Sequence, residues 1–110
     1  MYMLLSVGIL TYNQSQYIRQ CLDAVLMQEV DFDYEIVIGD DASTDGTIAI
    51  LEEYEDRVKT VKIIRSEKNE GISMNYKKVL SACTGDYIAL CEGDDFWTDP
   101  HKLQVQVDFL

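Results

Sequence analysis

A short apolar run passes directly into acidic residues in the segment Tyr87-Ile88-Ala89-Leu90-Cys91-Glu92-Gly93-Asp94-Asp95. The apolar run is typical of a buried strand in a parallel sheet. Three carboxylates in four positions at its end repel one another, which costs folding free energy. A hard divalent cation removes that cost. The segment therefore predicts a buried strand that ends at a metal site.

Strand and helix patterns alternate along the chain before this segment. We expect strands at residues 4–10, 34–39, 61–64 and 86–91, each followed by a helix. This order predicts an α/β fold with a doubly wound, mostly parallel sheet and right-handed crossovers. The last helix pattern begins at Asp99-Pro100 and reaches Leu110 without a stop signal. We therefore expect residues 1–110 to form the front half of a larger domain.

Local signals predict how the helices begin and end. Ser15 is a candidate N-cap for the first helix, and Ser43 or Thr44 for the second, because short polar side chains accept hydrogen bonds from the first N–H groups. Gly85 follows the third helix and suits a left-handed C-cap. The apolar face expected for that third helix consists of Ile72, Tyr76, Val79, Leu80 and Cys83.

The composition narrows the functional class. The 110 residues carry a formal net charge of −11, from 20 acidic and 9 basic side chains. This argues against a nucleic acid partner, which needs clustered lysine and arginine. Three cysteines without a paired motif favour reduced thiols and a cytoplasmic location. No apolar run is long enough to cross a bilayer, so we expect association with the inner face of a membrane only through parts not present here.

Polar clusters follow the strands at the edge where open parallel sheets bind ligands. Residues 11–13, 40–43, 69–71 and 92–95 follow the first, second, third and fourth expected strands. Taken singly, the clusters at residues 11–13 and 69–71 are better explained as packing and turn residues, and the cluster at residues 40–43 at least as well as a turn and helix cap. Glycine-rich phosphate loops of the dinucleotide and P-loop kinds are absent from the sequence. If a phosphate binds here, a metal must carry much of its charge.

Four stretches in register resemble the N-terminal half of family 2 glycosyltransferases, which have the GT-A fold. They are residues 6–13 (SVGILTYN), 34–47 (YEIVIGDDASTDGT), 69–73 (NEGIS) and 85–95 (GDYIALCEGDD). The resemblance implies a metal-dependent, inverting transfer of sugar from a nucleoside diphosphate sugar, with UDP as the expected nucleotide. The expected acceptor is a carbohydrate or a lipid-linked hydroxyl.

The resemblance also implies roles for individual residues. Thr11, Tyr12 and Asn13 would lie against the base and ribose, and Asp41 would accept a hydrogen bond from the base. Asp94 would lie near the ribose and the sugar, and Asp95 would bind Mg²⁺ or Mn²⁺ on the diphosphate. The general base of the family lies downstream of residue 110, so no catalytic residue is expected in this chain.

The sequence departs from the family pattern at three places. Leu10 replaces a common proline, and Glu92 replaces a common aspartate. The arginine expected after Gly71, near the diphosphate, is absent, with Asn75 and Lys77 as the candidate replacements. Two other readings stay open: a non-catalytic nucleotide-binding module on the same fold, and a nucleotidyltransferase. A phosphorylated receiver domain ranks lower, because its acidic residues follow different strands.

Overall fold

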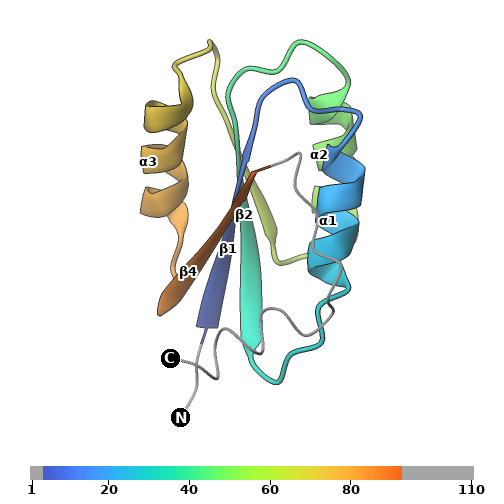
Figure 1. Ribbon diagram of the computed structural model, residues 1–110, viewed down its shortest axis with the longest axis vertical. Helices are drawn as coiled ribbons and strands as arrows, with labels where there is room; N and C mark the ends of the chain where they lie inside the picture. The colour runs from blue at the N-terminus through green and yellow to red at the C-terminus, as the bar shows by residue number, and fades with distance from the viewer. Residues whose placement is uncertain (1–3, 93–110) are drawn as a thin grey trace.

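The computed structural model describes residues 4–92, so Asp94, Asp95 and the helix expected after Asp99-Pro100 lie outside the described part. The elements are β1 (Leu4–Thr11), α1 (Ile18–Leu26), β2 (Asp33–Asp40), α2 (Thr47–Arg57), β3 (Val61–Arg65), α3 (Ile72–Ala82) and β4 (Tyr87–Glu92). All strand pairs are parallel, in the order β3-β2-β1-β4. The α1 and α2 helices cover one face of the sheet and α3 covers the other (Figure 1). The predicted α/β fold is confirmed.

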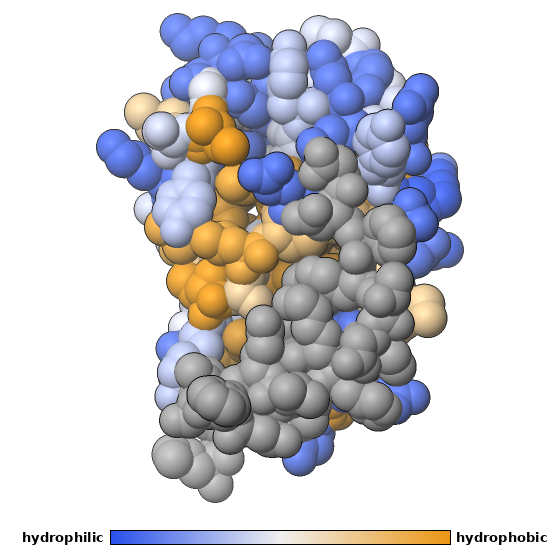
Figure 2. Space-filling view, viewed as in Figure 1, coloured by the Kyte–Doolittle hydropathy of each residue, from blue (hydrophilic) through white to orange (hydrophobic). Residues whose placement is uncertain are grey.

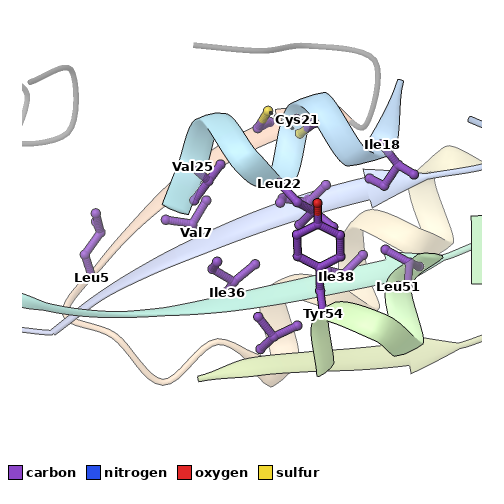
Figure 3. Packing of buried hydrophobic residues seen from close by; sticks show 13 residues of the cluster. Leu5, Val7, Ile18, Cys21, Leu22, Val25, Ile36, Ile38, Leu51 and Tyr54 are labelled. Carbon is purple, nitrogen blue, oxygen red and sulfur yellow. Dashed lines mark hydrogen bonds between the residues drawn. The ribbon is translucent and has the colours of Figure 1, made fainter. Parts of the chain in front are cut away.

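The main core lies between the sheet and the α1–α2 layer. Alternate residues of β1 and β2 point into this layer, and an apolar stripe of α1 meets them, as expected for the two periodicities. Figure 3 shows these side chains together with Leu51 and Tyr54 from α2. The fully buried aliphatic members of this cluster from β1, β2 and α1 are Val7, Ile9, Ile36, Ile38, Ile18, Leu22 and Val25. Each such side chain contributes about 1.5–3 kcal/mol through burial.

On the opposite face of the sheet, α3 lies close to the backbone of β1 and β2. Gly8 and Gly39 stand where a side chain would project toward α3. A Cβ atom at Gly39 would lie 2.4 Å from Asn75 Oδ1 and 2.4 Å from a methyl carbon of Val79. Asn75 and Val79 are the buried residues of α3. This helix therefore packs on the backbone of the central strands.

The predicted apolar face of α3 is wrong in part. Val79 is buried, but Ile72 is 64% exposed and Tyr76 is 39% exposed. A polar residue, Asn75, occupies the buried side instead. The reason is that this position of α3 faces the Gly39 carbonyl, to which the Asn75 amide donates a hydrogen bond that an apolar side chain could not make.

The strand predicted at residues 86–91 is present as β4, but the burial predicted for its apolar run at residues 87–90 is largely wrong. Tyr87, Ile88 and Leu90 are each more than 40% exposed, whereas Cys91 is buried. Within residues 4–92, β4 pairs with β1 alone and forms an edge of the sheet. Figure 2 shows the resulting apolar surface over this part of the molecule.

Three predicted cap assignments are wrong. The N-cap of α1 is Tyr17 and that of α2 is Gly46, neither with a side-chain cap bond. Asp45 takes the capping role at α2, since its Oδ1 accepts the backbone N–H of Thr47 at 2.9 Å. Gly85 does not have a positive φ. It is required for a different reason, because a Cβ there would lie 2.6 Å from the backbone nitrogen of Ser6.

Two further expectations concern cysteines and membrane spans. The three cysteines form no disulfide; Cys21 and Cys91 are buried, and Cys83 is half-buried. Among residues 4–92, no helix has the length and apolar character that crossing a bilayer would require.

Candidate functional site

A pocket opens at the carboxyl ends of β1 and β2, the edge that the sequence predicts. Its volume is about 240 Å³. The structure brings together Thr11, Tyr12 and Asp41 in its wall, but not Asn13. The remaining lining residues are Leu10, Gln14, Asn69, Gly71, Ile72, Asn75 and Glu92.

A buried polar cluster joins the two turns beneath this pocket. Asp40 is fully buried, and its Oδ1 accepts the hydroxyl of Thr11 at 2.7 Å. The same carboxylate accepts the backbone N–H of Ser43 at 2.9 Å and its hydroxyl at 2.5 Å. The Thr11 carbonyl accepts the N–H of Asp41 at 3.0 Å. Thr11 therefore fixes the end of β2 against the end of β1.

Asn13 connects the same two turns from the outside. Its φ is 50°, a left-handed conformation that asparagine tolerates. Its side-chain Oδ1 accepts the N–H of Thr44 at 2.7 Å, and its own N–H donates to Ser43 Oγ at 2.9 Å. The contacts of Asn13 explain the turn geometry, and its predicted nucleotide contact stays a prediction.

Tyr12 gives the pocket an aromatic surface. The residue is 44% exposed at the end of β1, beside the backbone of Thr11, whose side chain is tied to Asp40. A flat aromatic face on a fixed turn suits stacking against a planar heterocycle. The predicted place of Tyr12 beside a base is consistent with this position.

Asp41 is the buried carboxylate of the pocket wall. Its Oδ1 accepts the N–H of Glu70 at 2.8 Å, and its Oδ2 accepts the N–H of Gly71 at 2.9 Å. Asn69 Oδ1 also accepts the Gly71 N–H, at 3.1 Å. A carboxylate oxygen accepts two hydrogen bonds, so each oxygen of Asp41 keeps capacity for a further donor. The loop thus fixes the orientation of the Asp41 carboxylate and leaves part of its hydrogen-bond acceptor capacity open.

The backbone around Asp41 is unusual at two positions. Ala42 has a φ of 61°, a region that costs a residue with a side chain roughly 1–2 kcal/mol. Gly71 has a φ of 93°, where glycine pays no such cost. Ala42 follows Asp41 in the chain, and the Gly71 N–H donates to the Asp41 carboxylate, so the strained Ala42 and the left-handed glycine both lie at this end of the sheet.

The two candidate replacements for the absent arginine lie in different places. Asn75 is in the pocket wall, where its Nδ2 donates to the Gly39 carbonyl at 2.9 Å. Lys77 lies on another side of α3, beside Ile64 and Ser81. The basic residue that reaches the Asp41 loop is Lys78, which pairs with Glu70 at 2.5 Å. The sequence analysis did not consider Lys78. The signal was its place on the same helix as Asn75 and Lys77, directly after Lys77.

Gln14 was also missed as a lining residue. It follows Asn13 directly and belongs to the same turn after β1, which was the available signal. Its backbone N–H donates to Thr47 Oγ1 at 3.0 Å, so its position is fixed against the start of α2.

Glu92 is the described residue of the acidic segment in which the sequence predicts a metal site. Glu92 ends β4 and lines the pocket. Within residues 4–92, no three acidic, histidine or cysteine side chains come together in a metal-binding group. The carboxylate of Glu92 is a hard ligand suited to Mg²⁺ or Mn²⁺, and the predicted partners Asp94 and Asp95 lie outside the described residues.

Two relatives illustrate how far the sequence of this chain is shared. It is 48% identical over 107 residues to an uncharacterized protein of Mycobacterium tuberculosis, covering 96% of this chain and 31% of that protein. It is 37% identical over 105 residues to chondroitin synthase of Escherichia coli, covering 96% of this chain and 15% of that enzyme. The chain thus spans a third or less of the length of these relatives.

A solved structure shares its fold. The S. aureus protein TarS, residues 1–349, in complex with UDP, superposes with a TM-score of 0.84 and 29% identity. The superposition covers 99% of this chain and 32% of TarS. A sequence profile of glycosyl transferase family 2 matches residues 6–110. The chain therefore belongs to glycosyl transferase family 2.

Proposed function

We propose that residues 1–110 form the donor-binding half of a metal-dependent, inverting glycosyltransferase that uses a nucleoside diphosphate sugar, with UDP as the nucleotide. The observation that carries the proposal is the pocket at the carboxyl ends of β1 and β2, which joins Tyr12, Asp41 and Glu92 from three separate segments. The likeness to TarS, which is known in complexes with UDP and with UDP-GlcNAc, supports this choice of donor.

The described residues divide the work of binding the donor. The Tyr12 ring packs against the base, and the Asp41 carboxylate accepts a base N–H. The fixed orientation of Asp41 by Glu70 and Gly71 lowers the entropic cost of that contact. Thr11 and Asn13 hold the two turns in register beneath and beside the nucleoside.

The acidic segment from Glu92 onward is the proposed diphosphate end. Mg²⁺ or Mn²⁺, held by Asp95, would stabilise the charge that develops on the departing nucleoside diphosphate. Asp94 would lie near the ribose and the sugar. The general base and the binding site for a carbohydrate or lipid-linked acceptor belong to segments downstream of residue 110.

The proposal is tested by calorimetric titration of UDP into the full-length protein, with Mn²⁺ and with excess EDTA. We expect binding with Mn²⁺, weaker binding with EDTA, and no Mn²⁺ effect in the Asp95→Ala variant. Equal UDP affinity with and without metal would contradict the assignment of the acidic segment. Turnover of UDP-sugars by the full-length protein then separates an enzyme from a module that only binds nucleotides.

A further inference from the structure

Cys21 and Cys91 bring two sulfur atoms together in the core from positions that are 70 residues apart in the sequence. One Sγ atom lies on α1 and the other on β4, and the distance between them is 3.6 Å. Both side chains belong to the main core cluster, in which Figure 3 labels Cys21. Cys21 is fully buried and Cys91 is 6% exposed. A disulfide bond is about 2.0 Å long, so a closer approach of about 1.6 Å would join the two sulfur atoms.

The same two thiols contact the backbone of Glu92. The Glu92 carbonyl accepts the Cys91 thiol at 3.3 Å and the Cys21 thiol at 3.6 Å. Glu92 lines the pocket and is the first residue of the acidic segment at residues 92–95. A thiol donates through its S–H hydrogen, which a disulfide lacks. Joining the two sulfur atoms would therefore remove both of these contacts from the Glu92 carbonyl.

The end of β4 is the part of this arrangement that can move. On α1, Ile18 and Leu22 are fully buried in the core and hold the helix in place. Within residues 4–92, β4 pairs with β1 alone, and Cys91 stands between Leu90, which is 41% exposed, and the exposed Glu92. A strand end at a sheet edge opens at a lower free-energy cost than a packed core, which also gives a small oxidant access to Cys91.

We propose that Cys21 and Cys91 form a reversible disulfide when hydrogen peroxide oxidises the protein, and that the disulfide weakens nucleotide binding with Mn²⁺ by displacing Glu92. One sulfur attacks the O–O bond of the peroxide and becomes a sulfenic acid as water leaves, and the second sulfur then displaces the hydroxyl group, which leaves as a further water. Both S–H bonds break and one S–S bond forms, so the two thiols lose two electrons and two protons, and the peroxide is reduced to water.

The surroundings decide which state the pair occupies. In a reducing compartment, exchange with small thiols returns the disulfide to two thiols, so the bond would form only under oxidation. Formation of the disulfide does not depend on the proposed function. Its effect on nucleotide binding rests on that function, because Glu92 acts there through the proposed donor site.

Peptide mapping tests the disulfide. The full-length protein is treated with hydrogen peroxide or with dithiothreitol, alkylated, and digested with trypsin without reduction. Cys83→Ser is the background for this experiment, because residues 79–101 contain no lysine or arginine and trypsin leaves Cys83 and Cys91 in one peptide. We expect a linked pair of peptides that contain Cys21 and Cys91 after oxidation, and none after reduction. Oxidised protein without this linked pair would overturn the inference.

Calorimetric titration of UDP with Mn²⁺ tests the consequence. In the Cys83→Ser background, we expect UDP to bind about tenfold more weakly after oxidation, the effect of one lost contact, and dithiothreitol to restore the affinity. Cys21→Ala cannot form the disulfide and should show no such reversible loss, and Cys91→Ala tests the same point from the other side of the pair.

The outcomes that contradict the inference are distinct from failure of the proposed function. Equal UDP affinity in the reduced and the disulfide-linked protein would overturn the effect on binding, as would a reversible loss of the same size in Cys21→Ala. Reduced protein that binds no UDP would overturn the proposed function and the effect on binding together. Peptide mapping would still decide in that case whether Cys21 and Cys91 form a disulfide.

Discussion

Glu35 and Asp41 are two buried carboxylates at opposite ends of the same strand, and the molecule treats them differently. Glu35, near the start of β2, is 6% exposed, and Asp41, just after its end, is 4% exposed. Glu35 accepts hydrogen bonds from Ser6 Oγ at 2.5 Å, Lys62 Nζ at 2.8 Å, and the N–H and hydroxyl of Thr84 at 2.7 and 2.9 Å. Asp41 accepts two backbone N–H groups.

The two carboxylates differ in how much of their acceptor capacity is used by hydrogen bonds within the fold. Burial raises the pKa of Glu35, but the hydrogen bonds from Lys62, Ser6 and Thr84 outweigh it and lower that pKa to about 2. The four donors, three of them on Oε2 and Lys62 on Oε1, tie three strands to the turn after α3. Asp41 keeps acceptor capacity and borders a pocket. Glu35 and Asp41 therefore differ in the number of hydrogen bonds that they accept, and not in how deeply they are buried.

The largest expected effect is the loss of Glu35. In Glu35→Ala, the free energy of unfolding should fall by about 3 kcal/mol, because Ser6 and Thr84 lose their acceptor and a hydrogen-bonded ion pair is broken. Urea titration measures this quantity. Glu53→Ala is the control, since its pair with Arg19 is exposed on both sides and its loss should change the free energy of unfolding far less. Similar losses in the two variants would show that Glu35 is not the anchor.

The pH dependence of stability should follow the same carboxylate. The pKa of Glu35 is lowered on folding from 4.5 to about 2, so its stabilisation is fully present above about pH 4.5 and is lost as the pH falls toward 2. The size of this contribution is about 2–3 kcal/mol. Urea titrations of the parent and Glu35→Gln from pH 6 to pH 2 should therefore converge at the acidic end. Parallel curves over this range would contradict the assignment.

Asp41 should give the opposite pattern. In Asp41→Asn, UDP affinity should fall about 10- to 100-fold, because a charged acceptor for the base N–H is weakened. The free energy of unfolding should change less than in Glu35→Ala, because the amide still offers one acceptor to the loop. Calorimetry in the presence of Mn²⁺ checks the affinity. Unchanged UDP binding would remove Asp41 from the site.

The smallest expected effect tests the strain beside Asp41. Ala42→Gly should raise the free energy of unfolding by roughly 0.5–1 kcal/mol, because glycine adopts the φ of 61° without cost while adding freedom to the unfolded chain. Ala49→Gly, at an exposed position in the first turn of α2, should lower it by roughly 0.5–1 kcal/mol. A loss of stability in both variants would mean that the turn stores no strain.

The sequence predicted the order of the elements well because hydrophobic periodicity is local. It also placed Tyr12 and Asp41 at one edge, because the carboxyl ends of parallel strands meet there. It could not predict that the Ser43 hydroxyl would donate its hydrogen bond to Asp40, so that Asp45 accepts the first N–H of α2 instead. That choice depends on a contact with the end of β1.

The misplaced face of α3 has the same origin. Apolar spacing alone favoured Ile72 and Tyr76, whereas the buried Asn75 depends on Gly39, which is 36 residues away in the sequence. The exposure of β4 likewise depends on its position at the sheet edge rather than on its composition. Each of these predictions failed because the burial of the residues depends on contacts with segments that are distant in the sequence.

The contact of Gly39 with Asn75 sets the dimensions of the pocket through the main chain. Because α3 rests on a strand position without a side chain, its distance from the sheet is fixed by the thickness of a peptide backbone. Substitutions of the outward-facing residues of α3, such as Met74 and Lys77, should then leave the spacing of the pocket walls unchanged. The surface of this helix and the width of the pocket therefore depend on different faces of the same element.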